Sequence, residues 1–207
     1  MDEAMEKKLI KLAQKGNSSA FEKLIIKYEK NIYNICLRML NDEHGAYDAA
    51  QEVCMKIWRQ LHIFEGNSKF STWIYRIATN QCLDILRKYK NKNEISIYQT
   101  NKNSDDEWLL DIKDEKADID KHMEQLALQD VMQIALSELK DEYKQVIVLR
   151  ELQNQSYDEI GDILNISQGT VKSRLSRARS ALKKILSQNK EPYLSFFRQN
   201  SMKEDTL

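Results

Sequence analysis

The stretch "SYDEIGDILNISQGTVKSRLSRAR", residues 156–179, decides how the C-terminal part of the chain folds. Ser156 and Glu159 have the spacing of a capping box, which predicts that a helix begins just after Ser156. Asn165 suits the left-handed backbone of a tight turn, and Ser167 is placed to cap the following helix. We therefore expect two short helices joined by a tight turn. The second helix would bury Val171, Leu175, Ala178 and Leu182.

The same stretch has features of a DNA-binding unit. Gly161 stands where two helices are expected to cross closely, and from Lys172 to Lys190 there are seven basic residues and no acidic one. A helix that enters the major groove with cations beside it is what DNA docking requires. An ordinary helical hairpin with a solvated basic face is the alternative. The turn chemistry, the small residue and the one-sided basicity together favour DNA binding.

Composition points to an all-helical protein. The chain has 207 residues with five Gly and one Pro, and 42% of its residues are hydrophobic. Few turn-forming residues and many Leu, Ile, Lys and Glu are typical of helical domains. The net charge is zero, so no overall field draws the chain to nucleic acid, and the local distribution of charge must be considered instead.

Metal, redox and membrane sites receive no support. Cys36, Cys54 and Cys82 stand far apart, without a CxxC pair or zinc-like spacing, so free thiols in a reducing cytoplasm are expected. The N-terminus lacks the apolar segment of a signal peptide, and no run approaches the ~20 apolar residues of a membrane span. No triad or phosphate-binding loop indicates an enzyme, and we expect no cofactor and a cytoplasmic location.

The N-terminal half shows helical periodicity in four segments. A short helix over 1–15 precedes a break at Gly16-Asn17, and Ser19 with Glu22 predicts a capping box for a long helix. A turn is expected over 41–45, followed by a helix whose inward face includes Trp58. A loop over 64–69 then leads to a further helix, on which Phe70 and Trp73 are expected to be core residues rather than stacking platforms.

We expect two small helical domains joined by an acidic flexible linker. The periodicity weakens and acidic residues accumulate after Asn93. The predicted units are a first domain over 1–92, a linker over 93–122, a helix-turn-helix domain over 123–190 and a tail over 191–207. Four large apolar residues, Tyr193, Leu194, Phe196 and Phe197, mark the tail, and we expect them to fold back onto the second domain.

Three motifs taken together resemble a known family. "YDAAQEVCMKIWRQL" (47–61), "FEGNSKFSTWIYRIATNQCLDILRK" (64–88) and "GTVKSRLSRAR" (169–179) occur in the order and spacing of bacterial sigma factors of the extracytoplasmic-function group. The resemblance covers about residues 15–90 and 125–187. It implies a subunit that brings core RNA polymerase to promoters and melts the promoter DNA, without covalent chemistry. An anti-sigma factor is an expected further partner, and membrane insertion is not expected.

The resemblance also implies roles for individual residues. Core polymerase would bind Asp48, Gln51 and Glu52, which without the family would be interpreted as a solvated charged face. The minus-ten element would contact Asn67, Ser68, Lys69, Asn80 and Arg87, because an unstacked base needs polar edges and cations for its phosphates. The minus-thirty-five element would contact Gln168, Thr170, Lys172, Ser173, Arg174 and Arg177.

A stand-alone helix-turn-helix regulator is the alternative of a different class. Its DNA-binding unit would use residues 156–179 equally well. That interpretation leaves the "DAAQE" and "FSTW" segments of the N-terminal half without a function. The promoter-recognition subunit therefore accounts for more of the chain.

Overall fold

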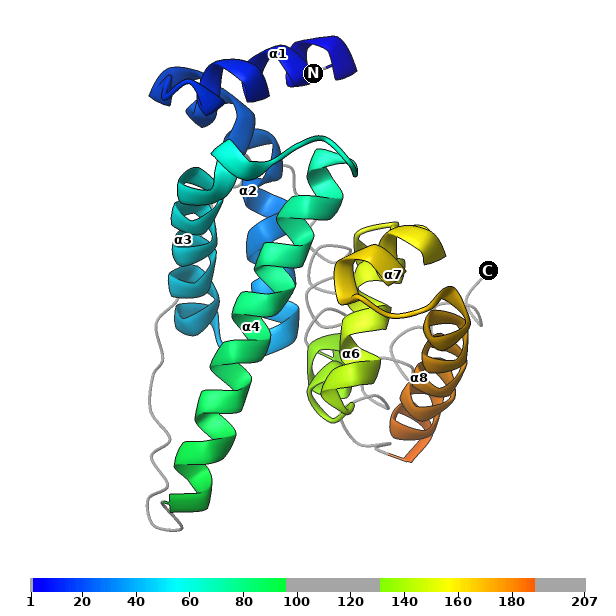
Figure 1. The fold of residues 1–207 in the computed structure, drawn as a ribbon. Helices are drawn as coiled ribbons and strands as arrows, with labels where there is room; N and C mark the ends of the chain where they lie inside the picture. The colour runs from blue at the N-terminus through cyan, green and yellow to red at the C-terminus, as the bar shows by residue number, and fades with distance from the viewer. Residues whose placement is uncertain (1, 96–130, 189–207) are drawn as a thin grey trace, which may run out of the picture.

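The structure, a computed structural model, describes residues 2–95 and 131–188, and every regular element in these two segments is helical. The all-helical class predicted from composition is confirmed (Figure 1). The expected tail, and the linker beyond residue 95, lie outside the described residues. Within the described part, no helix is both long and apolar enough to cross a bilayer.

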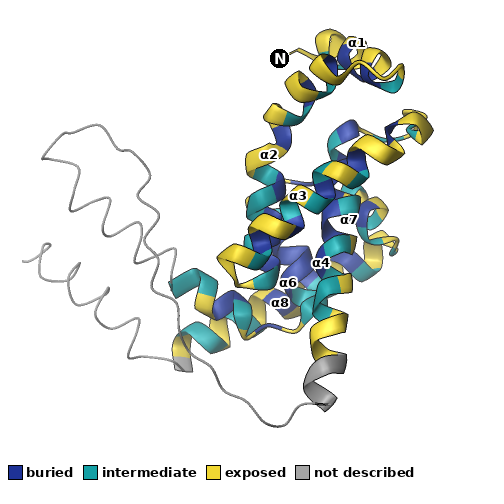
Figure 2. Ribbon diagram, turned by 90° about the vertical axis from the view of Figure 1, so that its left-hand side faces the viewer, coloured by how far each residue is buried: buried dark blue, intermediate teal, exposed yellow. Residues whose placement is uncertain are grey.

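The first segment is a bundle built around one long helix. Its elements are α1 (Glu3–Gln14), α2 (Ser18–Leu40), α3 (Glu43–Gln60), the 3₁₀ turn η1 (Leu61–Ile63) and α4 (Phe70–Ile95). Helices α2, α3 and α4 pack against one another, and α1 crosses the end of α2 (Figure 1). Leu24, Ile32, Ile57 and Ile74 have no exposed surface and form the centre of the bundle. Figure 2 shows the buried positions of these helices in dark blue.

Three local predictions for this bundle were wrong. Helix α2 is capped by Asn17, whose side chain accepts from the Ala20 amide at 2.9 Å, and not by a capping box at Ser19. Trp58 remains 39% exposed, because its ring lies at the edge of the bundle against Phe21, with centroids 4.8 Å apart. The turn before α3 is also shorter than expected, since Asn41 ends α2 and Asp42 already caps α3.

The second segment contains the predicted helix-turn-helix. Residues 131–137 are helical, and α6 (Asp141–Ile147) continues into a π-helical turn, η2 (Val148–Leu152). Helices α7 (Tyr157–Leu164) and α8 (Gln168–Gln188) follow. The capping box between Ser156 and Glu159 is present, and Asn165 adopts the left-handed conformation with φ of 53°. Ser167 caps α8 by accepting from the Thr170 amide at 3.2 Å.

Gly161 permits the tight turn between α7 and α8. A Cβ atom at this position would lie 2.9 Å from the backbone oxygen of Ile166, closer than real Cβ contacts come. Gly161 was expected to let two helices cross closely. The close approach exists, but it is between α7 and the turn that follows α7. Ile160 and Ile163 form the buried face of α7, whereas Leu164 is half-buried.

The two helical units pack against each other. Helix α7 packs beside α4, and α6 contacts α2 (Figure 1). Polar contacts join them: the Gln133 amide donates to the Leu37 carbonyl at 2.9 Å, and Arg38 donates to the Gln133 side chain at 2.6 Å. The ammonium of Lys144, a buried residue, donates to the Met39 carbonyl at 3.4 Å. The chain therefore forms one body in which the helix-turn-helix faces the N-terminal bundle.

Candidate nucleic-acid interface

The loop over 64–69 is fixed at both ends by aromatic side chains. The ring of Phe64 lies 5.2 Å from those of both Phe70 and Trp73, and Tyr28 packs edge-on against Phe70 at 5.7 Å. Phe70 is buried and Trp73 half-buried, in agreement with their predicted role as core residues. Gly66 has a φ of +81°, which lets the chain reverse between the two anchors.

Helix α1 supports the start of this loop. The Gln14 side-chain amide donates to the Leu61 carbonyl at 3.1 Å and to the Phe64 carbonyl at 2.8 Å. The Leu61 oxygen also accepts from the Phe64 amide at 3.1 Å, so Gln14 ties the turn after α3 to the end of α1. Between α1, α2 and the loop lies an open cavity of about 770 Å³, lined by Lys7, Lys11 and Lys27 together with the loop residues. Sequence reasoning missed Gln14 because its partners lie about fifty residues away.

The predicted minus-ten residues lie on this loop and along α4. Asn67 is exposed and bonds to Glu65, and Ser68 is half-buried. Asn80 and Arg87 are exposed on α4, where Arg87 pairs with Asp84 at 3.1 Å. Lys69 directly precedes α4, and helical geometry places it, Asn80 and Arg87 at intervals along one side of the helix. The loop and this face form one continuous surface suited to a single strand and its phosphates.

The predicted polymerase-binding residues share the outer face of α3. Asp48 and Gln51 are exposed, and Glu52 is half-buried and lies 3.8 Å from Arg59. Ala49 and Val53, on the opposite face of the helix, are buried and hold it to the bundle. This alternation leaves a rigid polar ridge available to a partner.

Helix α8 presents most of its predicted DNA contacts outward. Lys172, Ser173 and Arg177 are exposed on the face opposite the buried residues Val171, Leu175 and Ala178. Two further predicted DNA contacts lie at the start of the helix. Thr170 is half-buried, and the Gln168 side chain donates to Asp158 at 2.8 Å.

Arg174 differs from the other predicted contacts of α8. Its side chain is 27% exposed and lies 3.4 Å from Glu142 of α6, so it points along the domain surface. Arg179 is similarly paired, with Glu151 at 2.6 Å. Arg177, which lies between them, is exposed and on the outward face.

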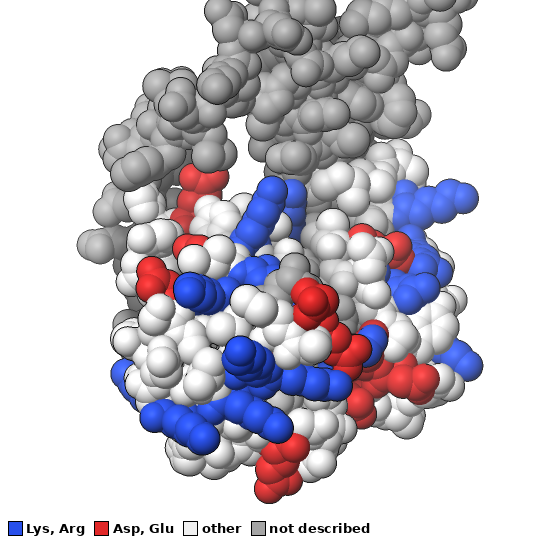
Figure 3. All heavy atoms as spheres, turned by 90° about the horizontal axis from the view of Figure 1, so that it is seen from above, with Lys and Arg blue, Asp and Glu red and all other residues white. Residues whose placement is uncertain are grey.

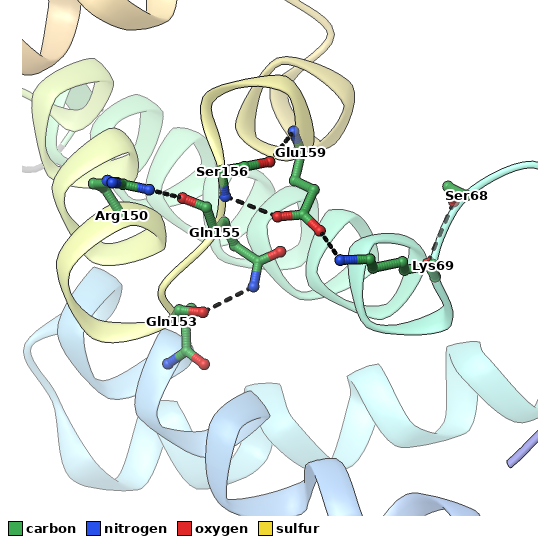
Figure 4. Close-up of polar contacts among 7 residues, drawn as sticks. All are labelled: Ser68, Lys69, Arg150, Gln153, Gln155, Ser156 and Glu159. Atoms are coloured by element: carbon green, nitrogen blue, oxygen red, sulfur yellow. Dashed lines mark hydrogen bonds and ion pairs between the residues drawn. The ribbon is translucent and has the colours of Figure 1, made fainter. Parts of the chain in front are cut away.

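One ion pair joins the two DNA-binding candidates directly. Lys69 of the loop lies 2.8 Å from Glu159 of α7, and the same carboxylate accepts from the Ser156 amide at 2.7 Å (Figure 4). The hydrogen bond that the Lys69 ammonium donates to Glu159 raises the pKa of Lys69. Burial alone would raise the pKa of Glu159, but its hydrogen bonds to Lys69 and Ser156 outweigh burial and lower it. No local sequence pattern links residues ninety positions apart, so the pair was not predicted.

Charge is mixed over the face that carries α1. Lysine and arginine side chains lie beside aspartate and glutamate on this face, without a uniform cationic field (Figure 3).

Within the described residues, no group of three His, Cys, Asp or Glu side chains could hold a metal ion. Cys36 and Cys82 are buried and unlinked, and burial raises the pKa of the half-buried Cys54 thiol. These thiols are core groups and not a reactive centre.

Comparison with known proteins identifies both units. Residues 24–92 match the family model for sigma-70 region 2, and residues 130–182 match that for sigma-70 region 4. The chain is 40% identical over 187 residues to the ECF RNA polymerase sigma factor SigW of Bacillus subtilis, covering 89% of this chain and 98% of that protein. It is 30% identical to the RNA polymerase sigma-H factor of Pseudomonas aeruginosa, covering 90% and 96%.

Solved structures share the fold. CnrH, in complex with the cytosolic domain of CnrY, matches with a TM-score of 0.65 at 22% identity, covering 89% of this chain and 99% of that one. The sigma factor RpoE of Bartonella quintana, in complex with the anti-sigma factor NepR, matches with a TM-score of 0.59 at 22% identity, covering 82% and 98%.

The fold and the two matched regions define a bacterial sigma factor. The chain belongs to the extracytoplasmic-function group of that family, as its motifs indicated.

Proposed function

We propose that this protein directs core RNA polymerase to specific promoters and opens the promoter DNA. The observation that carries the proposal is the presence in one chain of a helix-turn-helix with an outward basic face and a bundle with an anchored polar loop. The stand-alone regulator gives no role to that loop or to the ridge on α3. Like sigma factors generally, the protein would act as a DNA-binding initiation factor in the cytoplasm and not as an enzyme.

Each surface has one assigned task in this proposal. The ridge of Asp48, Gln51 and Glu52 binds core polymerase. The same domain, over 1–92, captures an unpaired base of the minus-ten element in the loop over 64–69. Asn67 and Ser68 supply polar edges there, while Lys69, Asn80 and Arg87 contact the strand. The domain over 123–190 binds the minus-thirty-five element through the start of α8. An anti-sigma factor is a further partner, since two relatives of this fold are known in such complexes or with a cytosolic partner domain.

Transcription with purified components tests the proposal. Core polymerase supplied with this protein should initiate at discrete promoters in a fragmented genomic library, whereas core polymerase alone should not. The double substitution Gln51→Ala and Glu52→Ala should reduce association with core polymerase with helical content unchanged, because both side chains lie on the surface of α3. Specific DNA binding by the free chain without any effect on initiation would support the stand-alone regulator instead.

A further inference from the structure

Helix α1 carries one stripe of polar side chains on the side that faces the loop over 64–69. Glu3, Lys7, Lys11 and Gln14 follow one another at steps of three or four residues, which places them on one side of the helix. All four line the open cavity of about 770 Å³ between α1, α2 and the loop. Gln14 holds two backbone carbonyls at the start of the loop, but the two lysines have no task in the function proposed above.

The wall that α1 forms is fastened to the bundle at several points. Leu9 and Ile10 are buried on its inner side. The Glu6 carboxylate, whose side chain is 14% exposed, accepts a hydrogen bond from the Tyr28 hydroxyl and pairs with Lys27, both on α2. A ligand that enters the cavity therefore meets side chains whose helix is already in position, which lowers the entropic cost of binding.

The lysines of the cavity differ in how readily they can take a new partner. Lys27 is held by the mostly buried Glu6. Lys7 pairs with Glu3 at 2.7 Å, but the two side chains are 70% and 84% exposed, so the pair contributes little and can be exchanged. Lys11 is exposed and has no carboxylate partner within residues 2–95 and 131–188. Two cations one helical turn apart, Lys7 and Lys11, are therefore available to an anion.

The stripe lies on the path of a DNA strand that follows α4. Asn80 and Arg87, assigned above to the minus-ten element, lie about 15 and 25 Å along α4 from its first residue. The loop and α1 lie at the end of the bundle where α4 begins (Figure 1). A strand that passes Arg87, then Asn80 and then the loop reaches α1 next. Since melting begins at the captured base, the strand that arrives at α1 is single-stranded.

We propose that Lys7 and Lys11 of α1 bind backbone phosphates of the melted non-template strand, directly beyond the captured base and towards the transcription start. The inference rests on the proposed function of the loop. Ligand cavities in proteins are typically about 300–1,000 Å³, so this one has room for the sugar-phosphate segment beside the base. An ammonium group recognises charge and not base identity, so the contact holds the strand open without adding to sequence preference.

The test removes charge from both sides of the contact, in core polymerase reconstituted with the full-length protein. The cavity variant, Lys7→Gln with Lys11→Gln, removes two cations that line the cavity. The control variant, Lys8→Gln with Lys15→Gln, removes two exposed cations of the same segment that do not line it. Glutamine forms helices about as well as lysine, so α1 is retained in both.

The probe is a promoter fragment recovered from the transcription assay. One version is unmodified. The other carries uncharged methylphosphonate linkages on the non-template strand, at the positions that directly follow the minus-ten element on the side of the transcription start. Binding is measured over a series of salt concentrations.

We expect the cavity variant to bind the unmodified fragment about fivefold more weakly than the wild type. Its plot of log affinity against log salt concentration should be shallower by about 1.4, since each single-strand phosphate contact contributes about 0.7. On the methylphosphonate fragment the cavity variant and the wild type should bind equally. The control variant should remain close to the wild type on both fragments.

Three results would overturn the inference. Undiminished binding by the cavity variant would return Lys7 and Lys11 to a solvated face. Equal losses in the cavity and control variants would mean that only overall charge matters. A loss that persists in full on the methylphosphonate fragment would mean that the lysines act on something other than these phosphates.

The experiment separates this inference from the proposed function. Initiation by the wild type at discrete promoters, and its loss when the minus-ten bases are changed, test the proposed function without any substitution in α1. If those results are obtained while the cavity variant behaves like the control, only the role of α1 is wrong. If the wild type does not initiate at all, the proposed function itself is wrong.

Discussion

At the scale of single residues, Arg177 is the side chain best placed to read DNA. It is exposed on the outward face of α8, unlike Arg174 and Arg179, which are paired with carboxylates of their own domain. We expect Arg177→Ala to weaken promoter binding by about 1–3 kcal/mol and to relax sequence preference at one position of the minus-thirty-five element. Binding competition with a set of single-base promoter variants measures both effects. Arg179→Ala is the control, for which a smaller loss without a change in preference is expected.

Gln14 gives a second prediction at this scale. Gln14→Glu keeps the shape of the side chain but replaces the amide donor by a carboxylate that the Leu61 and Phe64 carbonyls repel. We expect a loss of stability of about 1–3 kcal/mol, measured by thermal unfolding. Initiation should fall more than association with core polymerase, since the α3 ridge is unaffected. Equal losses in both assays would show that Gln14 supports the bundle generally and not the loop.

Local chemistry explains which residue predictions were right. The capping box of Ser156 and Glu159 was predictable because both partners lie within one helical turn. The box at Ser19 failed because Asn17, two residues earlier, is an equally good cap and begins the helix first. Trp58 occupies an apolar position in the helical repeat of α3. The repeat does not show that this position lies at the edge of the bundle, where the side chain stays exposed.

At the scale of elements, the turn between α7 and α8 requires a residue without a side chain at position 161, where Gly161 stands. Gly161→Ala would place a methyl group 2.9 Å from the Ile166 backbone oxygen, and backbone at a tight turn cannot move aside cheaply. We expect a loss of about 1–3 kcal/mol, with weaker DNA binding because α8 shifts. Gly169→Ala is the matched control in α8, where the nearest atom would be 3.9 Å away and a gain of up to about 1 kcal/mol is expected. Chemical denaturation of both variants decides the comparison.

The elements themselves were largely predictable from periodicity, caps and turn residues. Asn41, Asn154 and Asn165 all adopt positive φ, as expected for asparagine at left-handed positions that end helices or turns. The π-helical turn over Val148–Leu152 was not predicted, because the sequence "VLREL" fits an α-helix equally well. This turn contacts α2 and α7, and no local pattern encodes those contacts.

At the scale of the whole molecule, the sequence predicted two domains but not their contact. The fold class and the exposed surfaces followed from composition and from the family motifs. The pairing of Lys69 with Glu159 and of Lys90 with Asp141 joins side chains from opposite halves of the chain. Each of these residues also has an ordinary interpretation as a solvated charge, so only a three-dimensional structure could bring them together.

The pairing of Lys69 with Glu159 has a consequence for how salt affects DNA binding. Salt normally weakens such binding because each cation that meets a phosphate displaces a counterion from DNA. Here added salt also screens the internal pair and frees the cation for the phosphate. We therefore expect a plot of log affinity against log salt concentration, over about 50–200 mM, to be shallower for the wild type than for Glu159→Gln. Parallel lines would mean that Glu159 does not compete with DNA phosphates for Lys69. Converging lines would mean that ionic strength controls how readily the free subunit binds promoter DNA.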